Sequence, residues 1–276
     1  MVSMPNNQEY FVDIIIKRLD IESEHIIEKW KNPIDTSTHH FYIDNLLPES
    51  DVKEIYDAFP RNGEGFFDRK SFREKKRTST DLKNYKTILS EITYAIQDSR
   101  VVSKISELTN INYLEPDPNL YAAGLSMMFP NDFLNPHIDN SHDSERNLYR
   151  RLNLLYYVSP NWSFEKGGNF ELWDDNRKVP KTIVSHQNRL VVMETNKTSW
   201  HSVSKVLASR PRCCVSNYYF SKVSPYGNKY FHVTSFFGRP EEKTKTMYGV
   251  FDNAIRNIIS KTFKIGRGTK LLNKKK

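Results

Sequence analysis

The sequence predicts a mainly β fold with flanking helices, that is, an α+β protein whose core is an antiparallel β sandwich or barrel. Two observations favour this class. From residue 120 to residue 220, short apolar runs alternate with turn-forming residues, as in antiparallel sandwiches and barrels. Before residue 120, apolar residues recur at every third or fourth position, which indicates amphipathic helices. With 276 residues, the chain can bury a full core without disulfide bonds.

The individual elements follow from periodicity and from residues that cap or end them. Pro33 ends the first helix, and Ser50 or Asp51 is placed to cap the second. The stretch 61–83 is polar and partly basic, so we predict a long loop over the core. In order, the expected elements are a helix over 8–30, a strand over 40–44, a helix that ends at Phe59, the loop, helices over 85–97 and 100–108, strands over 124–129, 152–158, 169–173, 189–194 and 213–220, and a helix near 247–261.

Composition restricts the setting in which the chain works. Its two cysteines, Cys213 and Cys214, are adjacent, and neighbours on a strand point to opposite faces, so they are poorly placed to pair. A disulfide framework is excluded, and a cytoplasmic location is expected. No stretch approaches the roughly 20 apolar residues that span a bilayer. The net charge is +8, with much of the excess in 261–276; this basic tail could contact an anionic surface at the periphery of a membrane, although charged ends are usually only solvated.

A pattern of two histidines and one carboxylate suggests a metal site. His137 and Asp139 are separated by one residue, so on a strand they share a face and can bind one ion. His201 follows a later apolar run and could supply a third ligand. Such a set occupies one face of an octahedron and leaves open positions, which suits non-haem Fe(II) oxygenases. A His-x-Asp pair alone often arises by chance as a hydrogen-bonded surface pair, so the hypothesis depends on the residues that follow.

Polar residues on the later strands could bind an acidic co-substrate. Arg212 begins the last strong strand, where a guanidinium can clamp a carboxylate with two hydrogen bonds. Arg210 has the same strand parity and is a rival for this role. Asn153 and Tyr157 share one strand face, and Tyr157 could bring its hydroxyl to the same carboxylate. A core tyrosine with a satisfied hydroxyl would give the same pattern.

Taken in order, these segments resemble the 2-oxoglutarate/Fe(II) oxygenase superfamily, in particular its prolyl-4-hydroxylase-like branch. The resemblance covers about 120 to 222 and rests on Pro-His-Ile-Asp-Asn at 136–140, Leu-Tyr-Tyr-Val at 155–158, Gly-Gly-Asn-Phe-Glu-Leu-Trp at 167–173, His201, Arg212 and Tyr-Tyr-Phe at 218–220. It implies a double-stranded β-helix (jelly roll) as the catalytic core over 120–222. Residues 1–119 would pack helices and a strand on this core, and 223–276 would form a C-terminal extension with a basic helix and tail.

The resemblance also implies a chemistry. His137, Asp139 and His201 would hold Fe(II). Arg212, or alternatively Arg210, would bind the distal carboxylate of 2-oxoglutarate, and the helpers would be Tyr157 and Asn153. The implied reaction hydroxylates an unactivated C–H bond while 2-oxoglutarate loses carbon dioxide to give succinate, with dioxygen as oxidant and ascorbate as an optional reductant. Related halogenases leave the carboxylate position to chloride, so an aspartate there favours hydroxylation.

Several alternatives remain open. The substrate could be a small molecule, a glycan or a peptidyl group, and a basic cluster of Arg146, Arg150 and Arg151 would suit an anionic one, although it could equally be a solvated face. A non-redox, cupin-like jelly roll that binds a metal or a sugar would have no need of Arg212. A nucleic-acid demethylase would place its excess positive charge around the site rather than at the C-terminus, so nucleic acid is not the expected partner.

The remaining histidines have weaker signals. His142 with Asp143 makes a second metal pair conceivable, but it lacks a comparable downstream partner. The others are expected to be structural or exposed: His39, His40, His186 and His232.

Overall fold

The computed structural model describes residues 7–121, 123–174 and 178–240. Within these ranges, the strands form one antiparallel sheet that folds back on itself as a jelly roll, in the order β1-β9-β6-β11-β4-β3-β5-β10-β7-β8, with β12 beside β5 and β2 beside β3. The strands are β1 (His40–Ile43), β2 (Phe67–Lys70), β3 (Glu74–Ser79), β4 (Gly124–Met128), β5 (Phe133–Ile138), β6 (Tyr149–Tyr157), β7 (Phe170–Trp173), β8 (Pro180–Ile183), β9 (Arg189–Glu194), β10 (His201–Val203), β11 (Arg212–Ser221) and β12 (Ser235–Phe236). The predicted α+β jelly-roll class is confirmed.

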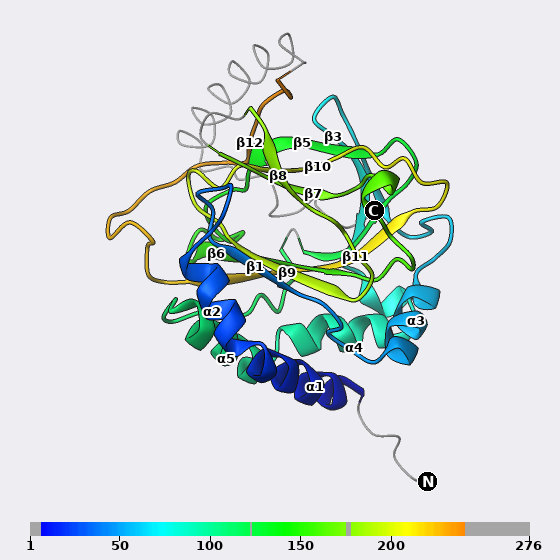
Figure 1. Cartoon of the computed structure of the whole chain (residues 1–276), viewed down its shortest axis with the longest axis horizontal. Coiled ribbons are helices and arrows are strands. Elements are labelled where there is room, and N and C mark those ends of the chain that lie inside the picture. The colour runs from blue at the N-terminus through cyan, green and yellow to red at the C-terminus, as the bar shows by residue number, and fades with distance from the viewer. Residues whose placement is uncertain (1–6, 122, 175–177, 241–276) are drawn as a thin grey trace.

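The helices cover one face of this folded sheet (Figure 1). They lie under the layer that contains β1, β9, β6 and β11, and the layer of β5, β10, β7 and β8 lies on the far side. The helices are α1 (Asn7–Ile21), α2 (Ser23–Lys31), α3 (Glu49–Ala58), α4 (Thr87–Ile96) and α5 (Ser99–Thr109). Of the residues that the structure describes, none belongs to a helix both long and apolar enough to cross a membrane. The helix expected near 247–261 lies outside the described residues.

Two details of the helical prediction are wrong. The helix expected over 8–30 is interrupted at Glu22, so α1 and α2 are separate. Neither Ser50 nor Asp51 caps α3, because the helix begins earlier, after Pro48, and no side chain accepts a capping hydrogen bond there. Asp51 instead lies in the first turn, where its negative charge interacts favourably with the helix dipole.

The predicted long loop over 61–83 is also wrong. It contains the hairpin of β2 and β3, followed by a short 3-10 helix, η1 (Leu82–Asn84), and β3 joins the main sheet between β4 and β5. The strand lacks apolar alternation because its side chains are held by charge: Glu74 lies 3.8 Å from Arg69 and 3.2 Å from Lys76. The side chains of β3 are charged and paired with one another, so its sequence lacks the alternation of apolar and polar residues by which a strand is predicted.

Alternation along β11 separates the two faces of the helix-covered layer. Cys213 and Val215 belong to the apolar cluster that packs against the helices. Cys214 belongs to a second cluster, inside the jelly roll, which also contains Tyr157 and Phe170. Side chains at 212, 214, 216 and 218 therefore share the interior face. This face carries the polar residues of the candidate site.

The buried carboxyl group of Asp117 is expected to make the stability of the fold depend on pH. Asp117 is 7% exposed, its Oδ2 has no hydrogen-bond partner, and burial raises its pKa from the ordinary value 3.8 to about 6. Because the folded-state pKa is raised, this group's contribution to stability is fully present below the unfolded pKa and is lost as the pH rises through about 6. We expect Asp117→Asn to increase the free energy of unfolding at about pH 8 by on the order of 2–3 kcal/mol.

The measurement is urea denaturation of the variant and the parent at about pH 8 and near pH 4, where the difference should vanish. Asp57→Asn is the matched control, since that carboxylate is exposed on α3. An equal shift at both pH values would contradict the assigned cause.

Candidate active site

Neighbouring strands bring three candidate ligands together inside the jelly roll. His137 on β5 is the direct cross-strand partner of His201 on β10, and Asp139 follows the end of β5. Nε2 of His137 lies 3.6 Å from Asp139 Oδ1, and Nε2 of His201 lies 3.7 Å from Asp139 Oδ2. Among the described residues, this is the one group of three such side chains whose ligand atoms all lie within 4.8 Å of one another.

Backbone carbonyl groups orient both imidazole rings. His137 Nδ1 lies 3.0 Å from the carbonyl oxygen of Asn135, and His201 Nδ1 lies 2.9 Å from that of Ser199. A carbonyl oxygen can only accept, so in each neutral ring the proton is on Nδ1 and donates. The Nε2 lone pairs therefore face Asp139. This is the arrangement by which proteins present histidine to a metal.

Burial and neighbouring charges keep His201 and Asp139 in metal-binding protonation states. Burial, together with the charge of His137, lowers the pKa of His201 to about 4, so the ring is neutral near pH 7. Burial alone would raise the pKa of Asp139, but its interactions with His137, Arg150 and His201 outweigh this and hold the pKa well below its usual range. Asp139 Oδ2 is buried without a hydrogen-bond partner. The neutral imidazole of His201 and an ionised, under-satisfied carboxylate fit a divalent cation such as Fe(II).

Arg212 and Tyr157 form a second polar group on the interior face. Arg212 is 4% exposed; its Nη1 donates to the Gly168 carbonyl at 3.0 Å, and its Nε has no hydrogen-bond partner. Its guanidinium lies 5.1 Å from the ring centre of Tyr157, whose buried hydroxyl is also unpartnered. Burial raises the pKa of Tyr157, which keeps this hydroxyl a donor. Buried donors without acceptors are suited to binding a carboxylate.

The structure distinguishes Arg212 from Arg210. The two were expected to share strand parity, but β11 begins at Arg212, and Arg210 lies before Pro211 in the preceding turn. The Arg210 guanidinium donates to the Pro160 carbonyl instead. Asn153 lies on the interior face of β6, four residues before Tyr157, and is 3% exposed. Its Oδ1 has no hydrogen-bond partner. Asn153 and Tyr157 therefore both line the interior, whereas Arg210 does not.

The basic cluster expected from the sequence does not form. Arg146 stacks on Phe231, with its guanidinium carbon 4.2 Å from the ring centre, and Arg151 points to Glu194 at 3.7 Å. Arg150 alone faces the candidate ligands: it is 1% exposed, and its Nη1 lies 3.6 Å from Asp139 Oδ2. A register shift between Tyr219 and Phe220 of β11 places Arg150 opposite Phe220. Sequence alternation cannot locate such a bulge.

The other histidines lie outside the ligand group. His142 is buried but is paired with the Ser141 hydroxyl and packs on Tyr149, so the second metal pair with Asp143 does not assemble. His39 and His40 bind backbone carbonyl groups, as predicted for structural histidines. Burial lowers the pKa of His232 to about 4, and the charge of Asp139 offsets this lowering in part.

Known proteins match the same part of the chain. A sequence model described as the 2OG-Fe(II) oxygenase superfamily matches residues 123–220, which include all three candidate ligands and Arg212. Over this segment, the chain is similar to the 2OG-Fe(II) oxygenase superfamily. Two curated relatives of this chain are named prolyl 3-hydroxylase OGFOD1. The mouse protein is 29% identical over 85 residues, and the Xenopus laevis protein is 36% identical over 84 residues. These matches cover 29% and 28% of the chain but span only 15% and 16% of the relatives' own length.

Solved prolyl hydroxylases share the fold of this chain. A Phytophthora capsici prolyl 4-hydroxylase has a TM-score of 0.53 at 13% identity and covers 91% of this chain and 78% of its own. A Trichoplax adhaerens prolyl hydroxylase, solved with a peptide fragment of a hypoxia-inducible factor oxygen degradation domain, has a TM-score of 0.50 at 19% identity and covers 78% and 91%. The predicted resemblance to the superfamily is confirmed over residues 123–220, and Fe(II) and 2-oxoglutarate are the cofactors that the description of the matching family names.

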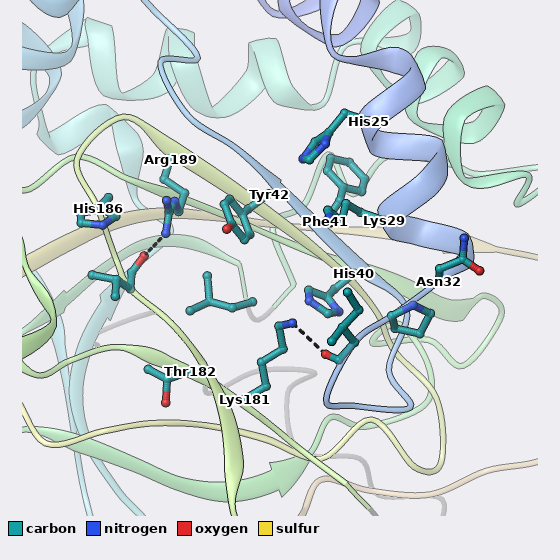
Figure 2. Close-up of a pocket in the computed structure, with 14 residues that line it drawn as sticks. His25, Lys29, Asn32, His40, Phe41, Tyr42, Lys181, Thr182, His186 and Arg189 are labelled. Carbon is teal, nitrogen blue, oxygen red and sulfur yellow. Dashed lines mark hydrogen bonds between the residues drawn. The ribbon is translucent and has the colours of Figure 1, made fainter.

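A separate cavity of about 380 Å³ lies away from these residues, between α2, β1 and β8 (Figure 2). Figure 2 shows Lys181 donating to the Ile34 carbonyl at 2.7 Å across one side, and Arg189 donating to the Val184 carbonyl at 2.9 Å on another. None of the three candidate ligands lines this cavity, nor does Arg212. The candidate site inside the jelly roll is therefore distinct from this surface cavity.

Proposed function

We propose that the protein is an Fe(II)- and 2-oxoglutarate-dependent dioxygenase that hydroxylates an unactivated C–H bond and converts 2-oxoglutarate to succinate and carbon dioxide. The observation that carries the proposal is the buried group of His137, Asp139 and His201, whose two Nε2 lone pairs face one under-satisfied carboxylate. These three residues are the proposed iron ligands. Iron with bound 2-oxoglutarate supplies the activation of dioxygen.

The chain's own residues supply binding and orientation. Arg212 pairs with the distal carboxylate of 2-oxoglutarate through the nitrogens that its bond to Gly168 leaves free. Tyr157 donates its hydroxyl to the same carboxylate, and farther along β6 the unpartnered Oδ1 of Asn153 can accept a hydrogen bond. Apolar side chains around them, including Phe170 and Leu172, keep water from the site.

We propose a peptidyl substrate with a prolyl residue at the site of hydroxylation. The names of the curated relatives and the peptide in the Trichoplax structure support this class over a small molecule or a glycan. Arg150 suits it, because two of its guanidinium nitrogens are buried without partners beside Asp139 and fit a carbonyl or carboxylate oxygen. An anionic substrate group remains compatible with Arg150.

A cupin-like binding protein without redox turnover is the second candidate. Such a protein would have no ligand to accept hydrogen bonds from Arg212 Nε and the Tyr157 hydroxyl. Leaving buried donors without an acceptor is destabilising. A cytoplasmic location stays a prediction. Contact of the basic tail with an anionic surface also stays a prediction, because residues 241–276 lie outside the described part of the chain.

The test is succinate formation from 2-oxoglutarate by protein purified without oxygen, loaded with Fe(II) and then exposed to air. The proposal predicts succinate that depends on iron and oxygen, and that increases when prolyl-containing peptides are added. Substitution of Zn(II) for Fe(II) is the control, because zinc has no redox chemistry. Absence of iron-dependent succinate with and without peptides would favour the cupin-like alternative.

A further inference from the structure

A strap from the C-terminal extension crosses the candidate metal site. We define the strap as residues 230–239, which lie beyond the segment 123–220 that matches the superfamily. Figure 1 shows its strand β12, in orange, beside β5. Phe236 is the cross-strand partner of His137, Ser235 is the partner of Ile138, and the Phe237 amide donates to the Pro136 carbonyl at 2.8 Å.

The strap completes the edge of the strand that bears His137. On its other edge, β5 pairs with β10. On this edge, β3 pairs only with the first part of β5, at Phe133 and Leu134. β12 then takes over at His137 and Ile138. The ligand-bearing half of β5 therefore depends on the strap for its second neighbour.

Phe236 contacts the His137 ring face to face. The two ring centres are 5.1 Å apart with an interplanar angle of 15°, and Phe236 is 5% exposed. The His201 ring lies 4.1 Å from His137 at 47°. The hydrogen bond from Nδ1 to Asn135 fixes one ring atom, but it does not by itself fix the tilt of the ring. Phe236 restricts that tilt and so restricts the direction of the Nε2 lone pair.

Polar contacts anchor the strap on both sides of Phe236. Before it, the His232 amide donates to the Ser141 hydroxyl at 2.9 Å, and the Ser141 amide donates to the His232 carbonyl at 3.0 Å. After it, Arg239 forms a 2.6 Å ion pair with the buried carboxylate of Glu171. Glu171 also accepts the hydroxyl of Ser202, the residue that follows His201. The strap is therefore attached to both histidine-bearing strands.

We propose that the strap is a structural part of the metal centre, and that Phe236 is a positioning residue that holds the His137 imidazole ready for the metal. The inference rests on the proposed function only in taking His137, Asp139 and His201 as the ligands of a divalent metal. Arg239 acts in the same way on the other side, by holding Glu171 and Ser202 next to His201.

The experiment compares Phe236→Leu, which keeps apolar volume, with Phe236→Tyr, which keeps the flat ring. Mn(II) and Co(II) binding are measured by calorimetry on the full chain without oxygen, and the visible spectrum of the Co(II) form reports ligand geometry. We expect Phe236→Leu to weaken Co(II) binding by about ten- to hundredfold, as for other groups that orient metal ligands, and to change the spectrum. Phe236→Tyr should remain within about threefold of the parent.

Thermal melting of the metal-free proteins separates positioning from folding. Phe164→Leu serves as the control, because this phenylalanine is 60% exposed in a surface turn. Unchanged Co(II) affinity and spectrum in a folded Phe236→Leu protein would overturn the role of Phe236 while leaving the proposed function intact. A parent protein that binds neither metal would overturn both.

Discussion

Replacing His201 by alanine is expected to abolish specific divalent-metal binding and to lower iron-dependent succinate formation by more than about a hundredfold, since loss of a group that merely orients a ligand already costs about ten- to hundredfold. His201 supplies one of the two imidazoles of the candidate ligand group. Among the described residues, no fourth His, Cys, Asp or Glu side chain lies in the group. The measurements are metal content after dialysis and initial rates of succinate formation.

A suitable control for this variant is His25→Ala, because His25 is exposed on α2, away from β5 and β10. Circular dichroism should show the same secondary structure in both variants. Retention of one iron per chain by a folded His201→Ala protein, with normal succinate formation, would mean that the metal is bound elsewhere.

Replacing Arg212 by glutamine is expected to raise the KM for 2-oxoglutarate strongly. Truncating one partner of a buried, hydrogen-bonded charge pair costs about 2–5 kcal/mol, which corresponds to a loss of affinity of about thirtyfold or more. The kcat at saturating 2-oxoglutarate should fall much less, because Arg212 contacts the end of the co-substrate that does not react. The measurement is the succinate rate over a series of 2-oxoglutarate concentrations.

The matched control is Arg210→Gln, two residues earlier in the same chain. The Arg210 guanidinium donates to the Pro160 carbonyl outside the interior. The KM of Arg210→Gln for 2-oxoglutarate should therefore stay within about threefold of the parent value. The opposite ranking, with a large KM increase in Arg210→Gln and none in Arg212→Gln, would reverse the assignment.

Local patterns in the sequence were sufficient for the part of the site that depends on strand alternation. His137 and Asp139 share a face because they are two residues apart, and Tyr157 faces the interior with Asn153 for the same reason. The antiparallel sandwich or barrel class followed from short apolar runs between turns, and the jelly roll followed from the resemblance to the family. The cross-strand partnership of His137 with His201 was not readable from alternation and came from the family's order of motifs.

What the sequence did not predict depends on contacts between distant segments. β3 is held by ion pairs rather than apolar alternation, and β12 is only two residues long, so neither has a periodic signal. Arg150 faces Asp139 because of a bulge in the pairing of β6 with β11. The prediction that Arg210 and Arg212 share one face of a strand is wrong, because β11 begins only at Arg212, after Pro211. Arg210 is therefore not on the strand.

The most direct measurement is an anaerobic titration of the iron-loaded parent protein with 2-oxoglutarate, followed by visible absorption and by iron analysis. The proposed centre predicts about one Fe(II) per chain and a charge-transfer band that grows with 2-oxoglutarate to one equivalent. The band should be absent in His201→Ala, and in Arg212→Gln it should need much higher 2-oxoglutarate concentrations. Iron that binds without any response to 2-oxoglutarate, or a band that persists unchanged in both variants, would contradict the centre built from His137, Asp139, His201 and Arg212.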